Sequence, residues 1–91
     1  MNHDINYFIY CSPHQSFSKQ ESDLITFAEK EELNVVGIYF GTFRSMLFRI
    51  QKSEAQGVIV SDITDLPITP LFTSLISKNL IRDIKYLTQS K

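Results

Sequence analysis

The stretch that decides the fold spans residues 5–18 and reads Ile-Asn-Tyr-Phe-Ile-Tyr-Cys-Ser-Pro-His-Gln-Ser-Phe-Ser. Its first half is aromatic, β-branched and almost continuously apolar, which is typical of a strand buried on both faces. A polar loop follows Cys11, and Ser18 with Glu21 three residues later matches a capping box, so a helix is predicted to begin there. A nucleophile-capable side chain between a strand and a helix lies where α/β proteins place their chemistry.

The same alternation continues along the chain. Residues 34–40, 58–60 and 81–87 are predicted strands; the second is wholly apolar and therefore central, and the charges within the last favour an edge position. Thr42 and Thr69 are predicted to cap two further helices, the second with Pro70 at its first position, and residues 62–67 are predicted to form a loop. The predicted buried helix positions are Leu24, Phe27, Ala28 and Leu33, then Phe43, Met46, Leu47 and Ile50, then Leu71, Phe72, Leu75 and Ile76.

The order of elements is βαβαβαβ, which predicts a small three-layer α/β fold. Connections of this length imply a parallel sheet with right-handed crossovers and helices on both faces. In such sheets the reaction site lies beyond the carboxyl ends of the strands. Here that edge carries residues 11–15, 40–42 and 62–65.

Length and composition indicate one domain over residues 1–91, with 43% apolar residues for a modest core. A lone cysteine excludes an internal disulfide and favours a reducing, cytoplasmic location. No apolar stretch approaches the roughly 20 residues that span a bilayer, and the first residues lack the pattern of a signal peptide. We therefore expect no membrane partner.

The formal net charge is −1, which predicts weak binding to DNA by the domain alone. The charges are unevenly distributed: residues 1–42 hold six acids and two lysines, whereas residues 43–91 hold seven bases and four acids. Arg44, Arg49 and Lys52 are candidates for DNA contact, although a solvated helix face explains them equally well. The asymmetry also fits an acidic partner or self-association between unlike faces.

Several of these residues resemble the catalytic domain of the serine recombinases (resolvases and invertases). The family's first strand reads Tyr-x-Arg-x-Ser, with a Gln four residues after the catalytic Ser and another five residues later. Tyr7, Gln15 and Gln20 match this pattern, and Cys11 occupies the position of the nucleophilic Ser. The third strand and following loop, residues 58–66, match in form the family's apolar strand followed by Lys-Leu-Asp-Arg-Leu. The resemblance covers roughly residues 5–87 and implies the same fold.

The catalytic arginines that the resemblance implies are replaced in this chain. Ile9 stands where the family has an Arg two residues before the nucleophile, and Thr64-Asp65 stands where it has Asp-Arg. A further Arg position is occupied by Ile68, and the mobile loop that supplies another is shortened to residues 41–43. Arginines stabilise the charge that builds on a phosphodiester during strand transfer. The family's dimerisation helix and helix-turn-helix module do not appear before Lys91.

We therefore predict a resolvase-like domain of mobile-element lineage that has lost recombinase chemistry. It would act as a regulatory or protein-interaction module, either as a homodimer or paired with a recombinase. The alternative is a divergent site-specific recombinase domain, a DNA strand transferase with Cys11 or Ser12 as nucleophile and Gln15 and Gln20 in its site. Ser12 is one residue out of register, so its side chain would point to the opposite face of the sheet if the strand extends that far.

Other interpretations of the same residues remain open. The loop after Cys11 loosely resembles the phosphocysteine loop of sugar-phosphotransferase IIB proteins, in which backbone N–H groups cradle a phosphate. Cys11 can equally be a small buried residue at a strand end, and His14 a solvated loop residue. Asp62 and Asp65 could bind Mg²⁺, but loop acids more often cap turns. We predict no metal site and no cofactor.

Overall fold

The computed structural model describes residues 5–87, which form four strands and three α-helices around one sheet. The strands pair in the order β2-β1-β3-β4, all parallel. This confirms the predicted α/β fold and places β3 inside the sheet and β4 at its edge. The elements are β1 (Asn6–Cys11), α1 (Phe17–Lys30), β2 (Asn34–Phe40), α2 (Phe43–Ser53), β3 (Gly57–Val60), the 3₁₀ turn η2 (Ile63–Asp65), α3 (Pro70–Ser77) and β4 (Asp83–Tyr86).

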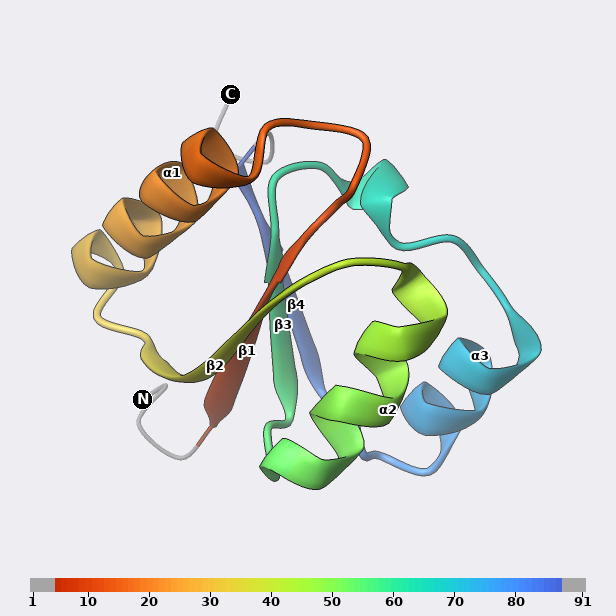
Figure 1. Cartoon of the computed structure of the whole chain (residues 1–91). Coiled ribbons are helices and arrows are strands. Elements are labelled where there is room, and N and C mark those ends of the chain that lie inside the picture. The colour runs from red at the N-terminus through yellow and green to blue at the C-terminus, as the bar shows by residue number, and fades with distance from the viewer. Residues whose placement is uncertain (1–4, 88–91) are drawn as a thin grey trace.

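The sheet separates two apolar layers (Figure 1), with α1 on one face and α2 and α3 on the other. Alternation along β1 decides which side chain enters which layer. Tyr7, Ile9 and Cys11 pack with Leu24 and Ala28 of α1. Phe8 and Tyr10 face the opposite layer, which contains the predicted stripe of α2 and Phe72 and Leu75 of α3.

Two glycines make room for aromatic rings of β1. A Cβ atom at Gly37 would lie 2.5 Å from the ring of Phe8, and one at Gly57 would lie 2.5 Å from the ring of Tyr7. Real Cβ atoms do not approach other atoms so closely, so both positions depend on glycine. The Tyr7 hydroxyl also donates a hydrogen bond to the carboxylate of Asp83, which links β1 to the edge strand β4.

The sequence predicted two of the three helix starts. Thr42 Oγ1 accepts from the backbone N–H of Ser45 at 3.3 Å, and Thr69 Oγ1 accepts from that of Phe72 at 3.2 Å. The predicted capping box at Ser18 was wrong, because α1 begins at Phe17 with Ser16 as N-cap and no side-chain capping bond. The earlier start allows the ring of Phe17 to pack on Phe40, with ring centroids 5.0 Å apart.

Three other features differ from the sequence prediction: one loop, the bounds of the last strand, and one helix position predicted to be buried. The loop predicted at residues 62–67 contains η2, capped by Asp62, whose Oδ1 accepts from the backbone N–H of Thr64 at 2.9 Å. The last strand is shorter than residues 81–87, because the N–H of Ile81 donates to Leu75 O at 3.2 Å and so belongs to the end of α3. Ile76, predicted to be buried, is 44% exposed, since α3 lies at the outer edge of its layer (Figure 1).

Candidate functional site

The carboxyl edge of the sheet carries a cavity of about 290 Å³ on the side of α2. Three segments that are distant in sequence form it: the loop after β1, the start of α2, and η2 (Figure 1). These are the segments that the sequence placed at this edge. We call it the serine cavity; its lining residues are Tyr10, Ser12, Pro13, His14, Thr42, Phe43, Thr64, Asp65 and Pro67.

Ser12 lines the serine cavity, whereas Cys11 faces the opposite layer, as alternation along the strand predicts. Ser12 is only 2% exposed, and its Oγ accepts a hydrogen bond from the backbone N–H of His14 at 3.2 Å. The loop therefore folds back on Ser12 and fixes its side chain. Of the two predicted nucleophile candidates, Ser12 is the one that borders open space.

Asp65 is the charged group of the serine cavity. Its Oδ2 is shielded from solvent and has no hydrogen-bond partner within residues 5–87. Burial raises the pKa of Asp65, and the charge of the adjacent Asp62 acts in the same direction, while the backbone of Asp62 and the nearby His14 side chain oppose the shift in part. The pKa of Asp62 is instead lowered, because its carboxylate accepts hydrogen bonds from the backbone and side chain of Thr64. The two carboxylates predicted at this edge thus differ: Asp62 caps the turn, whereas Asp65 keeps one oxygen, Oδ2, without a donor among residues 5–87.

Cys11 is fully buried against α1, in contact with the cluster that contains Ile9 and Leu24. Burial raises the pKa of the Cys11 thiol to about 11, and the carboxylates of Glu21 and Asp65 add to the shift. A thiol is nucleophilic as its thiolate, and at neutral pH this environment holds it protonated. The geometry is that of a packing residue.

A second cavity, of about 250 Å³, lies at the same edge on the side of α1. We call it the glutamine cavity; its lining residues are Gln15, Ser16, Lys19, Gln20, Asp23, Ser61 and Leu87. The two glutamines of the family pattern are therefore brought together here. Lys19 is the one lysine or arginine among the described residues that line either cavity, and its Nζ lies 3.3 Å from the carboxylate of Asp23.

Gln20 has a structural task that the sequence did not reveal. Its Oε1 accepts from the backbone N–H of Ser12 at 2.8 Å, and its Nε2 donates to the backbone carbonyl of Ser12 at 2.7 Å. Both residues are 2% exposed. The amide of Gln20 thus completes the backbone hydrogen bonds at the point where β1 ends. Gln15, by contrast, has an exposed side chain, and Gln20 Nε2 reaches only its carbonyl, at 3.3 Å.

The positions of the family's arginines lie in three different environments. Ile9 is fully buried in the layer of α1, Asp65 lines the serine cavity, and Ile68 is 89% exposed on the loop that leads to α3. The basic residues of α2 lie outside both cavities. Arg49 lies over the ring of Tyr39, with its Cζ 5.2 Å from the ring centroid, and shares a shallow depression with Lys52, while Arg44 lines a separate hollow beside Pro70.

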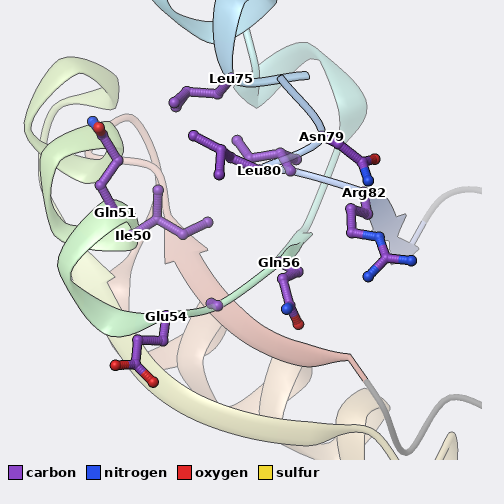
Figure 2. Close-up of a pocket in the computed structure, with 10 residues that line it drawn as sticks. Ile50, Gln51, Glu54, Gln56, Leu75, Asn79, Leu80 and Arg82 are labelled. Carbon is purple, nitrogen blue, oxygen red and sulfur yellow. The ribbon is translucent and has the colours of Figure 1, made fainter. Parts of the chain in front are cut away.

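A further cavity, of about 370 Å³, lies at the amino ends of β3 and β4, away from the predicted reaction edge. Figure 2 shows apolar side chains of Ile50, Leu75 and Leu80 around it, whereas the polar ends of Glu54 and Arg82 point away. Ligand sites in proteins combine an apolar wall with convergent polar groups. The polar groups converge at the carboxyl edge instead, which favours the serine cavity as the candidate site.

Within residues 5–87 no group of three His, Cys, Asp or Glu side chains is arranged to hold a metal ion. The helices in this part of the chain are also too short or too polar to cross a membrane.

Comparison with known proteins supports the fold through structure and not through sequence. No protein-family model and no curated protein matches the sequence. The chain is similar to the N-terminal catalytic domain of TP901-1 integrase, with a TM-score of 0.63, 18% identity, and coverage of 88% of this chain and 75% of that one. It is also similar to the C-terminal catalytic domain of ISC1926 TnpA, an IS607-like serine recombinase, with a TM-score of 0.67, 16% identity, and coverage of 93% and 73%. The chain therefore has the fold of a serine recombinase catalytic domain.

Proposed function

We propose that this chain is a recombinase-type domain without strand-transfer activity, which acts by binding a protein partner. The observation that carries the proposal is the charge at the carboxyl edge. The serine cavity holds the carboxylate of Asp65, and among its described lining residues there is neither arginine nor lysine. The partner would be a second copy of the chain or a recombinase with the same fold.

The physical reason lies in the chemistry of phosphoryl transfer. Negative charge on the phosphoryl oxygens must be stabilised by cations or by donors aimed at them. Removing one such donor from an active site typically slows the reaction about 10²–10³-fold. At this edge Ile9 is enclosed in the core and Asp65 adds a like charge, so several stabilising contacts are missing together. The paired Lys19 of the glutamine cavity is a weak substitute for a guanidinium clamp.

The burial of Cys11 supports the same conclusion. A thiol whose pKa is raised to about 11 is almost entirely protonated at neutral pH, so it can neither attack phosphorus nor accept a phosphoryl group efficiently. This weakens both roles that need a reactive Cys11, the divergent recombinase and the phosphocysteine carrier.

One observation favours a second candidate function, a divergent recombinase that uses Ser12. Ser12 Oγ borders the serine cavity, and His14 and Asp65 line the same cavity. The contact that His14 makes with Ser12 Oγ comes from its backbone N–H, however, so no side-chain base is positioned on the hydroxyl.

Incubation with supercoiled and nicked DNA, followed by denaturing electrophoresis, separates these functions. We expect no covalent protein–DNA species and no change in DNA topology, because no cation stabilises the phosphoryl oxygens. Cys11→Ala and Ser12→Ala are run in parallel. A covalent species that disappears in one of these variants would refute the proposal and identify the nucleophile.

A further inference from the structure

Asp65 lines the serine cavity, and one of its carboxylate oxygens is an acceptor without a donor among residues 5–87. Asp65 Oδ2 is shielded from solvent and has no hydrogen-bond partner in the described part of the chain. Leaving a buried polar atom unpaired typically costs about 1–3 kcal/mol, and more for a charged group. Burial accordingly raises the pKa of this carboxyl. A cation bound beside Asp65 in the serine cavity would favour the charged form of this carboxyl.

The neighbouring groups also favour a donor-rich ligand. The hydroxyls of Ser12, Thr42 and Thr64 line the same cavity and retain acceptor capacity. The hydroxyl of Thr64, for example, donates a hydrogen bond to Asp62 Oδ1 at 2.8 Å. The lone pairs of Thr64 Oγ1 therefore stay available to a ligand. A carboxylate surrounded by hydroxyl oxygens attracts a group with many N–H donors and repels a phosphate.

The lining and the volume of the serine cavity favour a guanidinium over an ammonium group. Phe43 contributes an aromatic ring, and the volume of about 290 Å³ exceeds several-fold the roughly 30 Å³ that one water occupies. A guanidinium offers five N–H donors in a plane and stacks on aromatic faces, whereas an ammonium is a compact, strongly hydrated charge.

The surroundings of the cavity indicate that the cation belongs to a protein. Ile63 precedes the cavity residue Thr64 and is 42% exposed, and Ile68 follows Pro67 and is 89% exposed. Large apolar side chains beside a polar pocket are typical of a surface that a partner covers. A free small cation would leave them in water.

We propose that the serine cavity receives the guanidinium of an arginine side chain presented by a partner protein, with Asp65 as its charged acceptor. This inference rests on the proposed function, since it names the chemistry by which the non-catalytic domain would bind its partner. The family resemblance implies an arginine at position 65. In this chain Asp65 would instead accept an arginine of the partner protein.

The test is an NMR titration of the isotope-labelled chain with N-acetylarginine methylamide and with N-acetylcitrulline methylamide, its uncharged near-isostere. We expect saturable shifts at the amides of Ser12, His14 and residues 42–43 and 64–66 with the arginine probe. Binding should be weaker by at least about tenfold for the citrulline probe and for Asp65→Asn, because each change removes one of the two charges of the hydrogen-bonded pair. Glu29→Gln removes the same charge from an exposed position on α1 and should bind like the unmodified chain.

Arginine binding that is absent, that maps elsewhere, or that survives unchanged in Asp65→Asn would overturn the inference. If Asp65→Asn does not fold, the comparison of the arginine and citrulline probes decides alone. Failure of this inference can be distinguished from failure of the proposed function. The NMR titration measures arginine binding, whereas the DNA incubation measures a covalent protein–DNA species.

Discussion

Ile9→Arg, which returns the family's residue to its position in β1, is expected to lower the free energy of unfolding by more than about 4 kcal/mol. Ile9 is fully buried, and its neighbours Cys11, Leu24 and Ala28 offer no carboxylate to pair with a guanidinium. An unpaired charge in such surroundings is among the most destabilising changes a core can receive. Since a domain of this size is stable by only about 5–14 kcal/mol, much of its stability would be lost. Urea unfolding followed by circular dichroism measures the change.

Ile9→Val is the matched control, because it removes one methyl group and adds no polar atom. It should lower the free energy of unfolding by only about 0.5–1.5 kcal/mol. If Ile9→Arg were as stable as Ile9→Val, the guanidinium would have to reach solvent or a carboxylate at the carboxyl edge. The site would then be open to an arginine at this position, contrary to the full burial of Ile9.

Gln20→Leu is expected to lower the free energy of unfolding by about 2–4 kcal/mol. The leucine side chain is similar in size but cannot bond to the backbone of Ser12. The N–H of Ser12 would lose its partner, and its carbonyl would retain only a weak contact from the N–H of Gln15, at 3.5 Å. Urea unfolding gives the energy, and hydrogen exchange of the Ser12 amide should accelerate because its opening becomes easier.

Gln15→Leu separates this structural role from a general effect of removing a glutamine at the carboxyl edge. The side chain of Gln15 is exposed, so its loss should change the free energy of unfolding by no more than about 0.5 kcal/mol. Equal effects of the two substitutions, or a loss below about 1 kcal/mol for Gln20→Leu, would show that the bonds between Gln20 and Ser12 matter little to stability.

The fold could be predicted from sequence where local pattern and tertiary packing agree. The wholly apolar run at residues 58–60 favoured an interior strand, and Thr42 and Thr69 are followed by regularly spaced apolar residues. Ser16 and Ser18 are both suitable N-caps, and the choice between them depends on contacts of Phe17 and Gln20 with distant residues. Local pattern does not contain that information.

The sequence predicted where the candidate site lies, but not which hydrogen bonds its residues make. Parallel topology placed residues 11–15, 40–42 and 62–65 at one edge, and alternation predicted that Ser12 and Cys11 face opposite layers. The unpaired oxygen of Asp65 could not be predicted, because it depends on how η2 turns over the sheet. The resemblance offered Gln20 as a site residue, but its hydrogen bonds to the backbone of Ser12 depend on the folded loop and could not be predicted from the sequence.

The most direct test of the central claim, that this recombinase-type fold holds no cationic site for a phosphodiester, is a titration of the isotope-labelled chain with a short DNA duplex. It is done at low ionic strength, where binding to phosphates is strongest. The amides of residues 11–12, 14–15 and 61–66 should show no saturable shift. Weak shifts confined to the basic face of α2, with Arg49 and Lys52, would agree with the account. Saturable shifts centred on residues 11–15 and 61–66 that added salt abolishes would contradict it.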